Sequence, residues 1–221
     1  MMKSISLRIF LLIFCCLNIY GQQKEITRQE YSDALMSKYQ PSSNKSYRSI
    51  SNTETFSILD GKLTRKENSV FEYLSSEKNR QIVIESIDGV TKKNEMIMIG
   101  SIVYQRIDDG EWKEKGLEVN GFIPSNIISS GVFEIKWVSK YTFVETAFNN
   151  QTVHLYEKNI KHRDGKFFHE KFWLNKEGLI LKIESRSGLI NPERLETHKV
   201  TDYEYDSDIK IEAPKMSLKK P

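Results

Sequence analysis

The order of apolar and polar residues along the chain indicates β-strands over most of its length. At 132–138, Phe133, Ile135 and Trp137 alternate with polar or charged side chains, so one face of such a strand would be dry and the other wet. Short runs rich in β-branched and aromatic residues recur down the chain. Strands are predicted at 54–59, 70–74, 81–87, 95–99, 102–107, 132–138, 142–148, 152–159, 166–174, 179–185, 197–205 and 209–213.

Asp-Gly pairs follow several of these runs, at Asp60, Asp88, Asp109 and Asp164. Asp-Gly favours the tight turn of a β-hairpin because both residues tolerate a positive φ. No stretch shows the alternation of strand and helix that a parallel sheet requires. The sequence therefore predicts a mainly β (α+β) fold in a single domain at 22–214, followed by a frayed tail at 215–221. Its main element would be one large curved antiparallel sheet of about ten strands, an incomplete β-barrel.

One helix is predicted near the start of this domain. Thr27 and Glu30 have the spacing of a capping box, in which each side chain accepts a hydrogen bond from the backbone N–H of the other residue. Tyr31, Leu35 and Tyr39 then recur every four residues and form a narrow apolar stripe. A short helix with one such stripe needs a surface to lie on, so we expect it to form a small lid over the sheet.

The segment 117–130 contains Pro124 and has weak periodicity, so we expect a loop with a short helix there. A sheet of about ten strands curls strongly. The lid helix and this segment would cover its dry face only in part. A partly filled apolar hollow is a place where an apolar ligand binds.

The first 21 residues have the layout of a secretory signal peptide, with Lys3 and Arg8 before or at the start of an apolar run and Gly21 at the expected cleavage site. The run is shorter than the ~20 residues that cross a bilayer. An uncleaved anchor and a lipidated Cys15 or Cys16 are the alternatives. We expect export to the periplasm or secretion.

Cleavage would also change the charge and the cysteine count. The whole chain of 221 residues holds 33 basic and 30 acidic residues, and two of the basic ones lie in the first 21 residues. Both cysteines lie there too. The remaining 200 residues would be nearly neutral and free of cysteine, which argues against nucleic acid as a partner and excludes disulfides, thiolate metal sites and a cysteine nucleophile.

Candidate catalytic and metal-binding residues are few. The sequence contains none of the common hydrolase, metalloprotease, phosphate-loop or dinucleotide motifs. With a two-residue hairpin at Asp164-Gly165, His162 and His169 would be diagonal neighbours on one face, but a third metal ligand is not evident. His154 and His198 are interpreted as solvated histidines. We therefore expect no enzyme activity, no metal and no cofactor.

Aromatic residues on the predicted strands allow two interpretations. They fill a core, which is the default for alternating aromatics, or they line a cavity for acyl chains. Met96 and Met98 would add adaptable apolar surface to such a cavity. From these residues alone, the core is favoured. The aromatics concerned are Phe133, Trp137, Phe143, Phe167, Phe172 and Trp173.

A resemblance to the LolA-like and LppX-like envelope proteins changes that balance. NEMIMIGSIVYQRIDDGEWKEK, from Asn94 to Lys115, resembles the family's strand ending in Gly, followed by x-Y-x-R/K and a Trp-closed hairpin. FFHEKFWLNKEGLILKIESR, from Phe167 to Arg186, is similar to its W-x-D/N-x-x-x-G-L-x-x-K/R hairpin. TETFSILDGKL and YEYDSDIKIEAP resemble an early strand and the closing strand, in the family's order. The resemblance implies a half-barrel with a helical lid that binds lipid or the acyl chains of lipoproteins without catalysis.

The prediction is thus a non-catalytic, exported and monomeric carrier for a lipid or an acylated protein. An envelope membrane protein is a further candidate partner. The alternative is an interaction or sensor module of the sigma-factor-regulator type, which shares this fold. Tyr31 and Leu35 are assigned to the lid. The residues predicted to line the pocket are Met96, Met98, Phe133, Ile135, Trp137, Leu181, Ile183 and Ile211.

Overall fold

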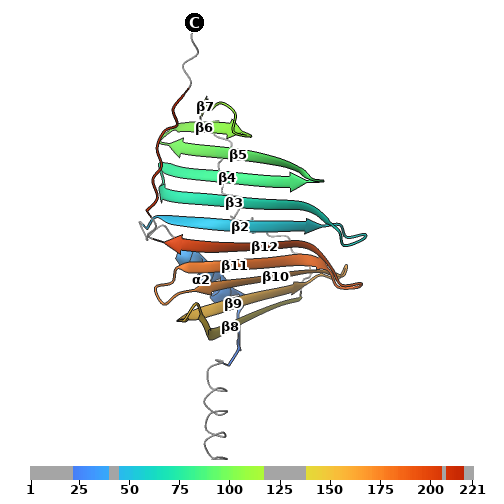
Figure 1. Ribbon diagram of the computed structural model, residues 1–221. Helices are drawn as coiled ribbons and strands as arrows, with labels where there is room; N and C mark the ends of the chain where they lie inside the picture. The colour runs from blue at the N-terminus through green and yellow to red at the C-terminus, as the bar shows by residue number, and fades with distance from the viewer. Residues whose placement is uncertain (1–21, 40–44, 117–137, 206–207, 217–221) are drawn as a thin grey trace, which may run out of the picture.

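The computed structural model describes residues 22–39, 45–116, 138–205 and 208–216. One helix and twelve strands make up this part of the chain (Figure 1). The elements are β1 (Lys24–Ile26), α2 (Arg28–Tyr39), β2 (Tyr47–Phe56), β3 (Leu63–Ser75), β4 (Lys78–Ile87), β5 (Val90–Ile99), β6 (Ile102–Ile107), β7 (Lys113–Gly116), β8 (Val138–Phe148), β9 (Gln151–Lys161), β10 (Lys166–Leu174), β11 (Ile180–Leu189) and β12 (Arg194–Tyr205).

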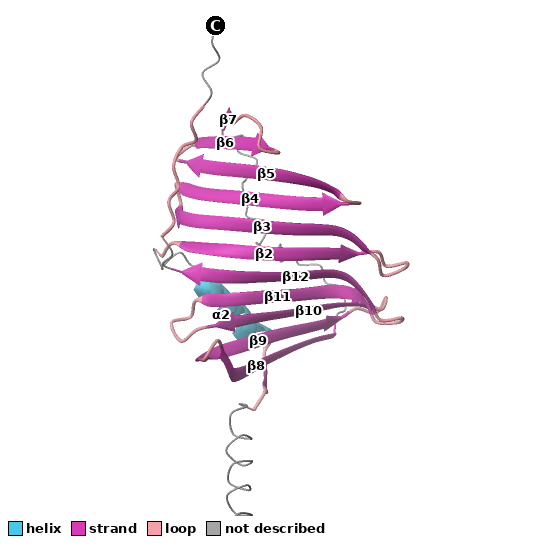
Figure 2. Ribbon diagram, in the orientation of Figure 1, coloured by secondary structure: helices cyan, strands magenta, loops and turns pink. Residues whose placement is uncertain are grey.

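All twelve strands belong to one antiparallel sheet, ordered β1-β8-β9-β10-β11-β12-β2-β3-β4-β5-β6-β7. Two pairings join strands that are far apart in the sequence. One is β12 with β2 near the middle of the sheet, and the other is β1 with β8 at one edge. The end strands β1 and β7 do not pair with each other, so the sheet stays open as a curved half-barrel (Figure 2). This confirms the predicted fold class.

Two turns show how the Asp-Gly signal works. Asp88 and Gly89 both have positive φ, 49° and 80°, and they join β4 to β5 through the pair Ile87 and Val90 as a two-residue hairpin requires. The turn at Asp164 is longer, because the backbone N–H of His162 donates to the carbonyl of Lys166. The register expected there was therefore wrong by one residue.

The capping box of α2 is confirmed. The backbone N–H of Thr27 donates to Glu30 Oε2 at 2.7 Å, and the backbone N–H of Glu30 donates to Thr27 Oγ1 at 3.1 Å. The hydrogen bonds that the Thr27 backbone N–H and the Thr27 hydroxyl donate to the Glu30 carboxylate hold its pKa below the ordinary value. Two N–H groups at the start of the helix are thereby satisfied, which explains why α2 begins at Arg28.

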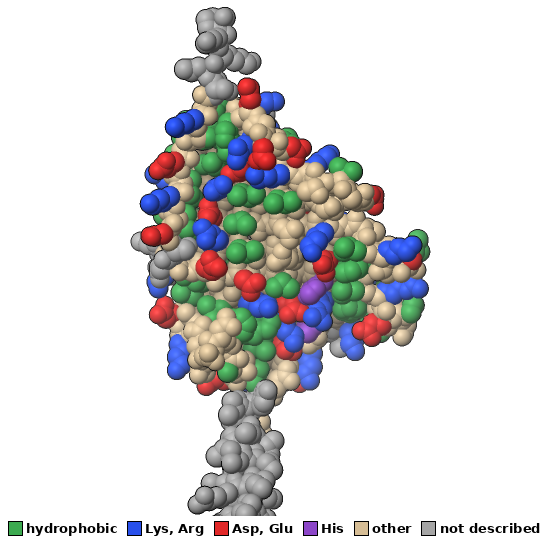
Figure 3. Space-filling view, in the orientation of Figure 1, with side chains coloured by type: hydrophobic (Ala, Val, Ile, Leu, Met, Phe, Trp, Pro, Cys, Tyr) green, Lys and Arg blue, Asp and Glu red, His purple; other side chains and the backbone are tan. Residues whose placement is uncertain are grey.

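The two faces of the sheet differ in what covers them. We call the face on which α2 packs the helix face, and its central row in the strand register runs through Phe172, Ile183, Thr201, Ser51 and Ser69. The opposite, outer face carries Trp173, Lys182, Ile50, Val70 and Ile82 in the neighbouring register positions. In Figure 1 the helix lies behind the strands, and Figure 3 therefore looks onto the outer face.

Each face has its own apolar core. On the helix face, Tyr31 of α2 packs against Tyr141, Phe172, Leu174 and Ile180. The Tyr31 ring lies 5.2 Å from the ring centroids of both Tyr141 and Phe172, and its hydroxyl donates to Glu170 Oε1 at 2.7 Å. The helix is thus anchored by ring packing and by one buried hydrogen bond.

The core of the outer face is formed by the C-terminal segment 208–216. Ile209 and Ile211 lie on Ile97 of β5, with Tyr104 and Trp112 beside them. Their alternation predicted a strand at 209–213, but the segment forms no strand in the sheet, so that prediction is wrong. Within the described part of the chain, no helix has the length and apolar character needed to span a membrane.

Candidate functional site on the helix face

The helix α2 covers only one half of the helix face. The strand residues that pack around Tyr31 belong to β1 and β8–β11, apart from Tyr203 of β12. Among the described residues, no second helix lies over β2–β6. Within the described part of the chain, the helix face of these strands therefore has no helical cover, and we call it the uncovered half.

Five aromatic side chains gather at one end of this uncovered half. Tyr47 of β2 lies at the centre, with its ring 5.2 Å from Tyr73 and 5.9 Å from Phe71, both on β3. Tyr203 and Tyr205 of β12 each lie 6.0 Å from Tyr47 on the other side. All five are half-buried. This Tyr47 cluster offers flat apolar surface together with tyrosine hydroxyls, a combination suited to amphipathic ligands.

Met96 and Met98 continue the surface along β5. Met98 is in register with Asn79 of β4, which is in turn in register with Tyr73 of the cluster. The Asn79 side-chain amide donates to Met98 Sδ at 3.8 Å. Met96 stands in the same relation to Phe71 through Gln81. Both methionines are half-buried. Their flexible thioethers give the surface the ability to adapt its shape.

Small hydroxyl side chains separate this half from the core around α2. Ser49 and Ser51 of β2 and Thr201 of β12 are buried, with 3–5% exposure, and the hydroxyls of Ser51 and Thr201 lie 2.7 Å apart. Ser69 of β3 continues the row. These short side chains lie between the Tyr31 core and the Tyr47 cluster. The polar atoms of the Ser51–Thr201 pair satisfy each other there.

The electrostatics of the helix face agree with limited access of water. Lys199 of β12 lies on this face, in register with Thr53 and Glu67. Burial lowers the pKa of the Lys199 ammonium, and the carboxylate of Glu67 opposes that effect. Burial likewise raises the pKa of Tyr156, which stacks on Phe172 at 4.9 Å. Both shifts follow from the desolvation of a charged form.

The structure places the predicted pocket residues in different surroundings. Met96, Met98 and Ile183 lie on the helix face, and Leu181 lies two residues before Ile183 on β11. Ile183 packs against the Tyr31 core. Ile211 lies on the outer face, 6% exposed against Ile97, and shares no surface with the methionines. Phe133, Ile135 and Trp137 lie outside the described residues.

The residues assigned to the lid belong to the core of the helix face. Tyr31 is 4% exposed, and Leu35 is partly buried against the same cluster. Sequence reasoning missed the Tyr47 cluster, because 45–51 has no clear alternation and was not predicted as a strand. The signals for it are the alternation of Phe71 and Tyr73 in the predicted strand 70–74 and of Tyr203 and Tyr205 at the end of the predicted strand 197–205.

The histidines lie apart from this surface or at its edge. The Nδ1 atom of His162 lies 2.5 Å from Asp164 Oδ1, in the turn before β10. His169 lies on the outer face with its Nε2 atom 3.8 Å from Glu157, and burial together with Lys171 and Arg186 lowers its pKa. The described ranges contain no group of three His, Cys, Asp or Glu side chains that could hold a metal ion.

Comparison with known proteins gives structural likenesses only. No family model and no curated protein matches the sequence. LprF from Mycobacterium bovis is 7% identical, with a TM-score of 0.49, over 86% of this chain and 99% of its own. A LolA superfamily protein from Nitrosomonas europaea is 11% identical, with a TM-score of 0.34, over 86% and 96%.

A putative outer membrane lipoprotein-sorting protein domain from Vibrio parahaemolyticus is 10% identical, with a TM-score of 0.30, over 82% of this chain and 93% of its own. Identities of 7–11% and TM-scores below 0.5 transfer neither a ligand nor an activity to this chain.

Proposed function

We propose that this protein is an exported, non-catalytic carrier that binds the acyl chains of a lipid or lipoprotein on the helix face. One observation carries the proposal. The Tyr47 cluster, Met96 and Met98 give the helix face a half-buried aromatic and thioether surface, with the amides of Asn79 and Gln81 between them and a row of short Ser and Thr side chains beside it. Apolar area of this kind on one face marks a binding surface in a soluble protein.

The energetics suit an acyl ligand. Each methylene removed from water contributes about 0.8 kcal/mol, so burying eight of them gains about 6 kcal/mol before the cost of ordering the chain. Such a ligand needs no ionic partner within the hollow. The tyrosine hydroxyls at the end of the surface can face the polar head of an amphiphile. Phe133, Ile135, Trp137, Leu181 and Ile183 are proposed to extend the same apolar lining.

The proposal includes the setting in which the carrier works. Residues 1–21 act as a signal peptide that directs the protein to the periplasm or out of the cell. The carrier works as a monomer, and an envelope membrane protein donates or receives its ligand. These points follow from the sequence and are tested by locating the protein in fractionated cells and by measuring its mass in solution.

The test of the ligand uses the protein exported by and purified from its native host. Native mass spectrometry should show a bound amphiphile, which organic extraction then releases for identification. Val83→Glu and Met98→Glu place a charge on the helix face and should abolish the bound mass. Ile84→Glu is the matched control, because Ile84 neighbours Val83 but lies on the outer face and is 38% exposed.

Two results would overturn the proposal. One is a native spectrum that shows only the bare protein mass. The other is an equal loss of bound amphiphile in Ile84→Glu and Met98→Glu, which would show that the apolar surface of the helix face does not hold it. Thermal unfolding of each variant confirms that the sheet remains folded in the comparison.

A further inference from the structure

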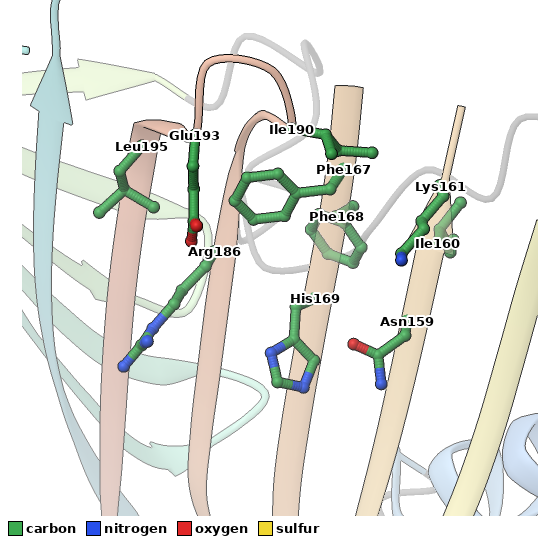
Figure 4. A pocket seen from close by; sticks show the side chains of 10 residues that line it. All are labelled: Asn159, Ile160, Lys161, Phe167, Phe168, His169, Arg186, Ile190, Glu193 and Leu195. Atoms are coloured by element: carbon green, nitrogen blue, oxygen red, sulfur yellow. The ribbon is translucent and has the colours of Figure 1, made fainter. Parts of the chain in front are cut away.

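A hollow lies on the outer face, at the end of the sheet where β9–β12 meet their turns (Figure 4). Its volume is about 440 Å³, within the ~300–1,000 Å³ typical of small-molecule sites. Phe167, Ile190 and Leu195 supply apolar walls, and Lys161, Arg186 and Glu193 supply charges. Phe167, Leu195, Lys161 and Arg186 come from four neighbouring strands, so a single rigid sheet positions them.

Close packing of the backbone fixes the spacing of two residues that line the hollow. Gly188 of β11 pairs with Phe167 on one side and with Leu195 on the other. A β-bulge between Ser187 and Gly188 brings the backbone of Arg194 against Gly188, and a Cβ atom built there would overlap the Arg194 carbonyl oxygen. Glycine is therefore required at this position. It lets β12 approach β11 closely, with Phe167 and Leu195 on either side of β11.

The charges around the hollow are unevenly distributed. In Figure 4, Lys161 lies on one side and Glu193 on the other. Lys161 is exposed and has no ion-pair partner among the described residues. Arg186 pairs with Glu184 at 2.6 Å but remains half-exposed and keeps further N–H donors. The Lys161 side thus carries available positive charge, and Asn159 adds an amide beside it.

These features define one kind of ligand. The space between Phe167, Ile190 and Leu195 accepts an aromatic ring or a short branched alkyl group. The ammonium of Lys161 favours an anionic group at the β9 side, and the carboxylate of Glu193 disfavours one at the opposite side. We propose that this hollow binds small organic acids in which a carboxylate is attached to an aromatic or branched apolar body, at a site separate from the helix face.

Isothermal titration calorimetry with phenylacetate tests this proposal on the protein exported and purified from its host. Phenethylamine and 2-phenylethanol present the same ring with a positive charge and with no charge. We expect phenylacetate to bind at least fivefold more tightly than either. Lys161→Glu should weaken phenylacetate binding at least fivefold, and Glu193→Gln should strengthen it.

Matched variants separate this site from general effects. Lys166→Glu makes the same charge change in the same hairpin, outside the hollow, and should alter the affinity less than twofold. Leu195→Asp should abolish binding while Met98→Glu on the helix face leaves it unchanged. This last variant distinguishes failure of the present proposal from failure of the carrier function, because it removes the acyl-chain surface and leaves the hollow intact.

The proposal is overturned if phenylacetate gives no binding heat at millimolar concentration, if phenethylamine binds equally well, or if Lys161→Glu and Lys166→Glu have the same effect. Lys161 is exposed, so its replacement should preserve the fold, and unchanged thermal unfolding of Lys161→Glu verifies this. Should Leu195→Asp fail to fold, Phe167→Ala replaces it, because it removes the opposite wall of the hollow without introducing a charge.

Discussion

Arg80 donates two hydrogen bonds to one carboxylate oxygen of Glu95, from Nε at 3.0 Å and from Nη2 at 2.5 Å. The other oxygen of Glu95 accepts two hydrogen bonds from Arg106, at 2.9 and 2.6 Å. Glu95 is only 1% exposed, on the outer face of β5. A carboxylate can be buried there because four charge-assisted hydrogen bonds replace its contacts with water.

This triad is the end of a ladder of alternating charge that crosses six neighbouring strands. Successive partners along the ladder lie 2.5–3.7 Å apart. The guanidinium of Arg106 also lies 4.7 Å from the ring centroid of Trp112. The ladder ties the open half-barrel together across its outer face. From β12 to β6 its members are Glu204, Arg48, Glu72, Arg80, Glu95 and Arg106.

Replacing Glu95 by glutamine should destabilise the protein by about 3 kcal/mol, because it removes the counter-charge of Arg106 and leaves Arg80 with only Glu72, at 3.7 Å. Urea unfolding followed by circular dichroism measures this change. Glu204→Gln is the control, since Glu204 is 55% exposed at the other end of the ladder and should cost less than about 1 kcal/mol. Equal losses in the two variants would contradict the assigned role of Glu95.

The same site predicts a dependence on pH. Burial of Glu95 favours its neutral form, but the hydrogen bonds from Arg106 and Arg80 outweigh burial and hold its pKa below the ordinary value. A lowered pKa in the folded state means that Glu95 contributes stability above its unfolded pKa, and that this contribution is lost as pH falls through the folded pKa. Asp109, whose pKa is lowered by Lys93, acts in the same direction.

Between pH 5 and pH 3, the wild-type protein should therefore lose more stability than Glu95→Gln, so the difference between the two free energies of unfolding narrows. Urea titrations at four or five pH values measure it. A difference that stays constant over this range, or that widens as the pH falls, would show that ionised Glu95 does not stabilise the fold.

The sequence predicted the fold class well because its signals are local. Asp88-Gly89 specifies a hairpin within four residues, and alternation specifies the faces of a single strand. Strand lengths were less accurate. The prediction began at residue 70, whereas β3 begins at Leu63. Residues 65–68 are polar on both faces but are held by ion pairs across the sheet, such as Arg65 with Glu85 at 2.5 Å. These ion pairs depend on which strands are neighbours in the sheet, and the sequence alone does not show which strands are neighbours.

The residues of the candidate site could likewise be predicted only in part from the sequence. Alternation placed Met96 and Met98 together, and the structure puts both on the helix face. Ile211 follows a similar alternation with Ile209 but packs onto the outer face. Which face a segment covers depends on the path of the chain between elements, and no periodicity records that path. The Tyr47 cluster was not predicted for the same reason, since its residues come from β2, β3 and β12 and meet only in the folded sheet.

The hydrogen bond that anchors α2 can be tested by removing the hydroxyl group of Tyr31. Tyr31→Phe removes the hydroxyl that donates to Glu170 and leaves a carboxylate that is 3% exposed without this donor. We expect a loss of about 2 kcal/mol in the free energy of unfolding. Tyr156→Phe is the control, because it removes a tyrosine hydroxyl from the same cluster without removing a hydrogen bond of the described structure. A smaller loss in Tyr31→Phe than in Tyr156→Phe would contradict the anchor.

Gly188→Ala tests the close backbone packing at the β-bulge between β11 and β12. The added methyl group would overlap the Arg194 carbonyl oxygen and approach the Leu195 backbone, and neither can retreat without opening the β11–β12 ladder. We expect a loss of about 3 kcal/mol, measured by urea unfolding. Gly165→Ala provides the comparison, because its positive φ of 85° costs about 1 kcal/mol while its methyl group meets no neighbour within 4 Å. If Gly188→Ala proved no more harmful than Gly165→Ala, close approach of the Arg194 backbone could not be the reason for glycine at this position.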